Sequence, residues 1–262
     1  MFLRCFLAVT TSLLAIMQAR ADDAEPAGNA EPAPTTLPST RPVQEGVARL
    51  RHLLIDLKTR QIRVDCEAIH AHMPLEFFCV ERGGQEHETV LRTDARPSLI
   101  HFGLLAMGLK PGEPAHLAQA DRTWFPPIGP PLKITCEYSL NGKTVVVPAN
   151  RLMRSVKTKQ EMPPMSWVFD GSRILPDGRY AADLTGYVVS IVNFDMTMID
   201  VPELASNANE TLEWEYNPDV LPPQGTPVTM IIEPGGPNAI TQPVQGMPAD
   251  QYNPGPGLNG GQ

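Results

Sequence analysis

The sequence predicts an α+β fold, with one or more largely antiparallel sheets, one buried central helix and short helical pieces. Apolar and polar residues alternate in many short segments, which is typical of strands with one buried face. The pair Asn141-Gly142 joins two such segments and is the strongest hairpin signal, because a type I′ turn needs positive φ at both central residues. One longer apolar run, about residues 97–107, has the end signals of a helix.

Four strands are predicted before the helix. The turn Lys58-Thr59-Arg60 joins the first two strands into a hairpin, and Gly83-Gly84 separates the last two. The four strands cover residues 53–57, 61–67, 75–80 and 86–92.

The helix begins at Pro97, which suits a first helical turn, and it stops before Gly108, with Pro111 beyond. His101 is the only polar side chain between Leu99 and Met107, so the helix has no polar face. A helix that is apolar all round is expected to be buried. A Pro-rich loop follows over residues 111–131. Loops of this length often act as lids or binding segments, and a well-packed surface loop is the alternative.

The remaining strands follow this loop. Two of them form the hairpin around Asn141-Gly142, and the turns at Asp177-Gly178 and Gly186 separate three others. The strands cover residues 132–140, 143–147, 167–175, 179–183, 187–194 and 226–233.

The two ends of the chain predict export and two tails. Residues 1–21 have the pattern of a signal peptide, with Arg4 before a short apolar stretch and a cleavage site at Ala19-Arg20-Ala21. That stretch is too short for a membrane span, and no later segment approaches one. Residues 22–45 and 234–262 are rich in Pro without apolar periodicity and are predicted to be disordered. One domain, residues 46–233, lies between them, and we expect it to be periplasmic or secreted.

The net charge and the number of cysteines limit which partners and which disulfides are expected. Cleavage after Ala21 removes two arginines and no acidic residue, so the net charge changes from −8 to −10 and disfavours nucleic acid as a partner. The mature chain keeps Cys66, Cys79 and Cys136, and this odd number excludes complete pairing. All three lie on apolar faces of predicted strands, which favours buried free thiols; a disulfide between Cys66 and Cys79 is the alternative.

The densest polar cluster is Glu86-His87-Glu88. Carboxylates beside an imidazole can bind a divalent metal or tune the histidine as a general base. On a strand, however, His87 faces away from both glutamates, and a polar strand start at a sheet edge is the simpler interpretation. His101 must find hydrogen-bond partners inside its apolar helix, either as a satisfied core histidine or in a site shared with His87.

Two other patterns are weaker. His70 and His72 can start a metal site but cannot define one. Gly171-Ser172-Arg173 lacks the second glycine of a hydrolase elbow, so Ser172 is a weak nucleophile candidate. Arg173 is either an anion contact or a solvated strand residue.

Several motifs stand out by their order and spacing: Glu86-His87-Glu88, Arg96-Pro97-Ser98 leading to His101, residues 104–112, Trp167-Val168-Phe169-Asp170-Gly171-Ser172-Arg173, Tyr180-Ala181-Ala182-Asp183 and the strand after Gly186. Together they resemble the YdjY-like domain family over roughly residues 53–202. The resemblance implies an exported bacterial protein of a family without an established activity. It strengthens Glu86, His87 and His101 as site residues, and Trp167, Glu88 and Arg173 complete the ligand-binding candidates. Gln85 stands where relatives usually carry lysine, and the iron–sulfur cysteine motifs of some relatives are missing, so no cluster is implied.

Three hypotheses follow. We favour a non-catalytic exported domain that binds a small ligand or an envelope protein. The alternative is a metal-binding protein or metal-dependent enzyme that uses His87 and His101 with Glu86 or Glu88. A third interpretation is a structural unit of an envelope assembly.

Overall fold

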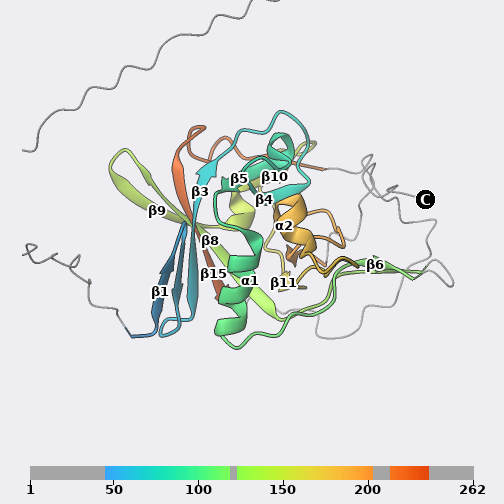
Figure 1. The fold of residues 1–262 in the computed structure, drawn as a ribbon. Coiled ribbons are helices and arrows are strands. Elements are labelled where there is room, and N and C mark those ends of the chain that lie inside the picture. The colour runs from blue at the N-terminus through green and yellow to red at the C-terminus, as the bar shows by residue number, and fades with distance from the viewer. Residues whose placement is uncertain (1–44, 119–122, 203–212, 236–262) are drawn as a thin grey trace, which may run out of the picture. The chain divides into compact units, whose positions relative to one another are not determined.

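The computed structural model describes residues 45–118, 123–202 and 213–235 (Figure 1). The expected α+β class is wrong: the fold is mostly β and is built around a sheet that closes on itself. The predicted signal peptide and nearly all of both predicted tails lie outside the described residues. No described helix has the length and apolar character that a membrane crossing needs.

The main sheet has the hydrogen-bonded order β1-β2-β3-β15-β8-β11-β13-β12-β4-β5, and β5 also pairs with β3. This last pairing closes a ring of eight strands, from β3 around to β5, while β1 and β2 extend the sheet beyond β3 and β9 pairs with β8. Within it, only the pairs β12–β13 and β4–β5 are parallel. The strands are β1 (Val47–Leu50), β2 (Leu53–Asp56), β3 (Gln61–Ala68), β4 (Phe77–Glu81), β5 (Thr89–Thr93), β8 (Pro131–Leu140), β9 (Lys143–Pro148), β11 (Trp167–Phe169), β12 (Tyr187–Ser190), β13 (Ile199–Asp200) and β15 (Pro227–Pro234).

Both predicted hairpins are present. Strands β2 and β3 pair antiparallel around the turn at residues 57–60. Strands β8 and β9 pair around Asn141 and Gly142, whose φ angles of +52° and +74° are those of a type I′ turn. The turn chemistry therefore determined the register of this hairpin, as expected.

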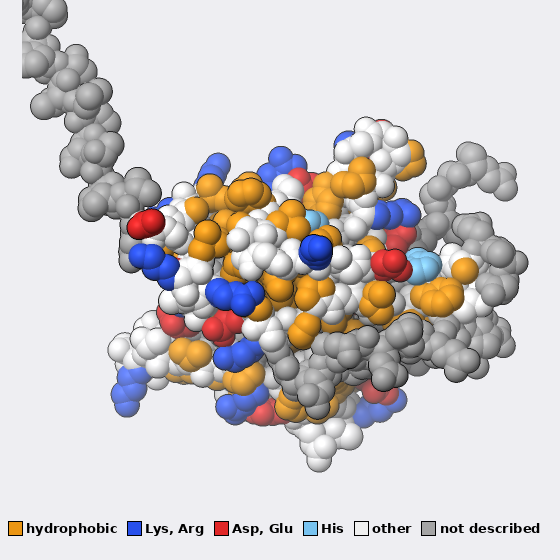
Figure 2. Space-filling view, turned by 90° about the horizontal axis from the view of Figure 1, so that it is seen from below, with side chains coloured by type: hydrophobic (Ala, Val, Ile, Leu, Met, Phe, Trp, Pro, Cys, Tyr) orange, Lys and Arg blue, Asp and Glu red, His pale blue; other side chains and the backbone are white. Residues whose placement is uncertain are grey.

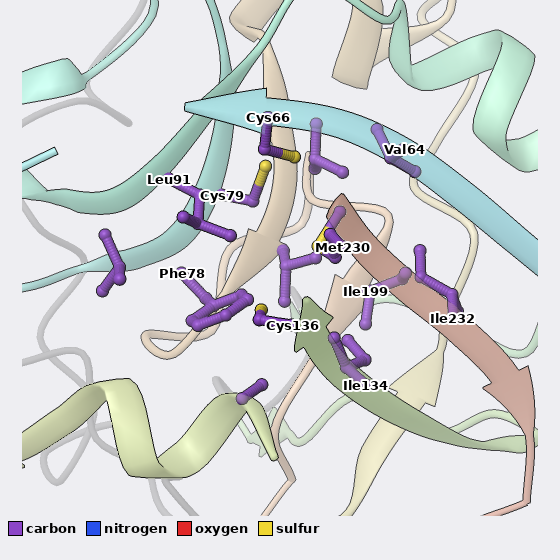
Figure 3. Close-up of a cluster of buried hydrophobic side chains, with 14 of the residues drawn as sticks. Val64, Cys66, Phe78, Cys79, Leu91, Ile134, Cys136, Ile199, Met230 and Ile232 are labelled. Carbon is purple, nitrogen blue, oxygen red and sulfur yellow. The ribbon is translucent and has the colours of Figure 1, made fainter. Parts of the chain in front are cut away.

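Alternation along the strands places an apolar layer inside the ring. In β3 the buried residues are Ile62, Val64, Cys66 and Ala68, and the residues between them are more exposed and mostly charged. Strands β8 and β15 contribute further buried side chains to the same cluster (Figure 3). Burial of these apolar side chains supplies the main driving force for the closed sheet.

Helix α1 (Pro97–Ala106) occurs where it was predicted, but it is not buried all round. Its buried residues are Pro97, Ile100, Gly103 and Leu104, and it contacts β2, β3 and the short helix α2 (Ala181–Thr185) (Figure 1). A Cβ atom on Gly103 would lie 2.8 Å from Ile62 Cδ1 and 3.2 Å from Ile55 Cδ1, so glycine lets the helix approach the sheet closely. The opposite side of the helix, with Phe102 and Leu105, is exposed.

Several smaller elements differ from the prediction. Residues 86–88 form a 3₁₀ turn, η1 (Glu86–Glu88), and α2 replaces the strand predicted at 179–183. The Pro-rich loop contains a two-residue ladder between β6 (His116–Leu117) and β7 (Trp124–Phe125). The element η2 (Ala149–Leu152) and the strands β10 (Met153–Ser155), β14 (Trp214–Tyr216), β1 and β13 were not predicted, because such short elements carry little periodicity.

Candidate functional site

The most informative cavity lies between the exposed side of α1 and the segment that follows β11. Its volume is about 390 Å³, and apolar side chains make up most of its wall. Three of them, Phe102, Leu105 and Ile174, are 57%, 44% and 65% exposed, which is unusual for large apolar residues at one place. The cavity is lined by Ser98, His101, Phe102, Leu105, Pro111, Gly171, Ser172, Ile174 and Tyr180.

His101 and Tyr180 supply the polar groups of this cavity, and a short hydrogen-bond chain orients them. The Tyr180 hydroxyl donates to the Gly171 carbonyl at 3.0 Å, and His101 Nδ1 lies 2.8 Å from the same hydroxyl. Since the hydroxyl proton is used on Gly171, the His101 Nδ1–H must donate to Tyr180. The other ring nitrogen, Nε2, is then an acceptor without a hydrogen-bond donor among the described residues.

Burial favours the neutral form of both groups. Desolvation lowers the pKa of His101 below its ordinary value, although the Gly171 carbonyl opposes this effect. Desolvation also raises the pKa of the Tyr180 hydroxyl, and the nearby Asp170 carboxylate adds to this. The pocket therefore presents a neutral imidazole acceptor, oriented by edge-on contacts with Phe169 and Tyr180 at ring-centroid distances of 4.9 and 5.3 Å.

The floor of the pocket depends on an unusual backbone path. Gly171 has φ +93°, and a Cβ atom there would lie 2.3 Å from Pro111 Cβ. Only glycine satisfies both conditions, which explains the glycine in this part of the motif. The Ser172 hydroxyl donates to the Met196 carbonyl at 2.9 Å, so it is held by the fold rather than activated as a nucleophile.

The cluster Glu86-His87-Glu88 is divided among three environments. Glu86 accepts from Arg92 Nη1 at 2.6 Å and from the Gly83 N–H at 2.8 Å, contacts that brace the turn at η1. His87 has a side chain that is 59% exposed and lies 3.7 Å from Glu88. Because η1 is a 3₁₀ turn, the expected strand alternation does not apply to these residues.

Glu88 lies beside a carboxylate that the sequence did not single out, Glu76. Burial and then the charge of Glu88 raise the pKa of Glu76 from 4.5 to about 7. The recorded contacts of His101 are with other residues, namely Tyr180, Phe169 and Gly171. The two predicted site histidines therefore belong to different environments.

The remaining candidates have structural partners. Arg173 Nη1 lies 2.7 Å from Asp195, in an ion pair. Trp167 is buried and packs against Phe78 at a centroid distance of 5.6 Å. His70, part of the H-x-H pattern, stacks on Tyr216 at 4.7 Å and bonds the Pro222 carbonyl.

All three cysteines are free and buried in the closed sheet. The side chains of Cys66 and Cys79 point toward one another, while Cys136 lies apart beside Phe78 (Figure 3). Burial raises the pKa of the Cys79 and Cys136 thiols well above the ordinary value, which suppresses thiolate formation. The pairing of Cys66 with Cys79 is absent from the structure and stays a prediction.

No group of three or more His, Cys, Asp and Glu side chains in the described ranges is arranged to hold a metal ion. The metal site expected from His87, His101 and a neighbouring glutamate gains no support from their positions. The divalent metal cofactor therefore stays a prediction from the sequence.

A second, larger cavity of about 540 Å³ lies between β8 and the segment at 161–167. All three charged residues in its lining are already paired: Arg151 with Glu161 at 2.9 Å, and Lys133 with Glu233 at 3.0 Å. We therefore favour the smaller cavity, because it combines exposed apolar side chains with an acceptor whose second nitrogen is not engaged. Hydrophobic side chains also reach the surface among charged ones on the face in Figure 2.

Tyr180 is the functional candidate that sequence reasoning missed. Tyr180 lies in one of the quoted motifs, but only the fold brings it to His101. The sequence pattern that could have indicated this pocket was the all-round apolar character of the α1 segment. It was interpreted as complete burial of the helix, whereas Phe102 and Leu105 are exposed and line the pocket.

The comparisons with known proteins give a family and no characterised relative. A family model described as YdjY domain matches residues 53–233, more than half of the chain. No curated protein and no solved structure matches this sequence.

Proposed function

This chain belongs to the YdjY domain family, and we propose that it is an exported, non-catalytic domain that binds a small, largely apolar ligand in the His101 pocket. The observation that supports this proposal best is the convergence of Phe102, Leu105 and Ile174, all exposed, on a cavity with one neutral imidazole acceptor. Apolar area supplies affinity in such sites, and a few polar groups fix the orientation of the ligand.

The chemistry of the pocket defines the ligand class. His101 Nε2 accepts a hydrogen bond, so the ligand should carry an N–H or O–H donor. The pocket is lined by apolar and aromatic side chains around that acceptor, which suits a flat or aromatic body. Neither Ser172 nor Tyr180 is activated as a nucleophile, which supports binding without catalysis.

A matched pair of probes tests this recognition. Indole has an aromatic body and an N–H donor, whereas 1-methylindole has the same body without the donor. We expect indole to shift the amide NMR signals of Gly171 and Ser172 and to bind about 5–10-fold more tightly than 1-methylindole, because one hydrogen bond contributes about 1–1.5 kcal/mol.

Two variants complete this experiment. His101→Phe keeps a ring but removes the acceptor, and it should abolish the difference between the two probes. The control His87→Phe changes an exposed histidine elsewhere and should preserve the difference. Equal binding of both probes to the wild-type protein would disprove recognition through His101.

Export is the second part of the proposal and rests on the pattern of residues 1–21. We expect the protein recovered outside the cytoplasm to begin at Asp22, as N-terminal sequencing would show. A cytoplasmic product that begins at Met1 would contradict it.

A further inference from the structure

A cluster of buried oxygen atoms without hydrogen-bond partners lies behind the floor of the pocket. Among the described residues, every buried side-chain oxygen without a partner belongs to Asp170 or to the segment 193–200. The atoms are both carboxylate oxygens of Asp170, Oδ2 of Asp200, Oδ1 of Asn193, Oδ1 of Asp195 and Oγ1 of Thr197. Buried polar atoms nearly always have partners, so this concentration requires an explanation.

The sheet topology brings Asp170 and Asp200 together. Strands β11 and β13 pair antiparallel with Val168 opposite Asp200, which places Asp170 and Asp200 on the same face as diagonal neighbours. Asn193 follows β12 and donates through Nδ2 to Asp200 Oδ1 at 2.8 Å. The side-chain amide group of Asn193 therefore lies beside the same carboxylate. Hydrogen bonds from the Gly171 N–H to the Met198 carbonyl and from the Ser172 hydroxyl to the Met196 carbonyl place the segment around Thr197 beside the residues that follow Asp170. Asp170 and Asp200 also repel one another electrostatically, as close carboxylates do.

The chain itself does not neutralise this pair. Asp170 and Asp200 are 1% and 0% exposed, and no described lysine or arginine pairs with either. The N–H groups of Gly171 and Ser172 lower the pKa of Asp170, but neither makes a hydrogen bond of acceptable geometry to it, and the Gly171 N–H donates to the Met198 carbonyl. Two buried negative charges without a counter-charge are strongly unfavourable.

We propose that Asp170, Asp200, Asn193 Oδ1 and Thr197 Oγ1 bind one calcium ion that is enclosed by the fold. All four donors are oxygen atoms, which is the ligand type of Ca²⁺, and two carboxylates match the double charge of the ion. These residues offer five oxygen atoms that have no partner among the described residues, so at least one further oxygen ligand, such as a water molecule, is needed to reach the roughly six to eight that Ca²⁺ takes. Zinc and copper, which favour nitrogen or sulfur ligands, are not suited to this set.

Asp195 lies outside the proposed ligand set. Its Oδ2 is engaged by Arg173 at 2.7 Å, and its side chain is only half-buried. The alternative to the ion is that Asp170 and Asp200 hold protons, since burial raises the pKa of both carboxyl groups. The two explanations differ in the calcium content that they require: one ion per chain for the first and none for the second.

The test uses the chain from Asp22 to Gln262, unfolded in guanidinium with chelator and refolded either with calcium or with chelator. Refolding is needed because a site that is closed to solvent exchanges its ion slowly. We expect one calcium per chain after gel filtration. We also expect a rise in Tm of about 5–10 °C at a calcium concentration 100-fold above Kd.

Asp170→Asn and Asp200→Asn preserve shape and remove one charge each, so both should lose the calcium and the rise in Tm. Glu161→Gln removes one charge at a surface ion pair and should keep both. Absence of calcium in the refolded wild-type protein, or full retention in both Asn variants, would overturn the proposal. If the Asn variants do not fold, the calcium content of the wild-type protein decides alone.

Discussion

At the scale of a single residue, the raised pKa of Glu76 has a clear consequence for the pH dependence of stability. It precedes β4, is half-buried, and lies beside Glu88, whose own side chain is only 18% exposed. The folded protein therefore keeps a proton on Glu76 up to about pH 7, whereas the unfolded chain releases it near pH 4.5. Between these values the native state binds more protons, so stability falls as the pH rises.

We predict that the free energy of unfolding of Glu76→Gln, relative to that of the wild-type protein, increases between pH 5 and pH 8. The increase should be about 2 kcal/mol, a value reduced for the partial exposure of Glu76. Urea unfolding at four pH values between 5 and 8 measures it. The control Glu161→Gln should run parallel to wild type, and a parallel Glu76→Gln curve would contradict the shifted pKa.

The sequence identified several interesting residues without revealing their partners. His101 was expected to need partners, and it has them in Tyr180 and Phe169. The prediction that His87 alternates with its neighbours was wrong because residues 86–88 form a 3₁₀ turn rather than a strand, and Glu86 accepts the Gly83 N–H in this region. Alternation holds only in regular strands, and a polar segment gives no periodic signal that distinguishes a strand from a turn.

Helix α1 shows what determines packing at the scale of one element. Gly103 faces Ile62 and Ile55, and an added Cβ atom would meet Ile62 Cδ1 at 2.8 Å. Outside this contact, replacing glycine by alanine in a helix is favourable by about 1 kcal/mol. The sign of the substitution therefore depends on whether the sheet can move away.

We predict that Gly103→Ala destabilises the protein by about 1–2 kcal/mol, because overpacking costs more than helix propensity gains. Denaturant unfolding measures the change. Leu105→Ala, on the exposed side of the same helix, should change stability by no more than about 0.5 kcal/mol. A more stable Gly103→Ala variant would show that α1 shifts freely over β2 and β3.

Elements with strong local signals were predicted well, and those without were not. The turn at Asn141-Gly142 and the stop at Gly108 have positive φ angles, as expected. Helix α2 was assigned as a strand because Gly186 was interpreted as a turn between strands. Gly186 is instead the left-handed residue that ends a five-residue helix, and so short a helix has almost no period to detect.

At the scale of the whole molecule, the closed sheet was beyond sequence reasoning. Closure depends on pairings between distant segments, such as Cys66 with Thr93 and Val168 with Asp200. Periodicity predicts which face of a strand is buried but contains no information about which strand lies beside it. The same limit explains why the Asp170–Asp200 pair could not be foreseen, since β13 has two residues.

The three cysteines report on this closure, because they come from β3, β4 and β8 and all lie inside the ring. A thiol reagent can reach them only when strands separate, and burial also suppresses the reactive thiolate of Cys79 and Cys136. Their labelling should therefore follow opening of the sheet rather than local fluctuation.

We predict that the chain from Asp22 to Gln262 shows no rapidly reacting thiol when folded and three when unfolded in denaturant without reductant. Reaction with a chromogenic disulfide reagent counts them, and Lys143→Cys at the exposed hairpin end should add one fast thiol. A count of one in denaturant would show that one disulfide has formed, because a single bond consumes two of three thiols, and mapping of the linked peptides would then test the Cys66–Cys79 pairing. Rapid labelling in the folded state would show instead that strand pairing between β3 and β5 opens independently of the rest of the ring.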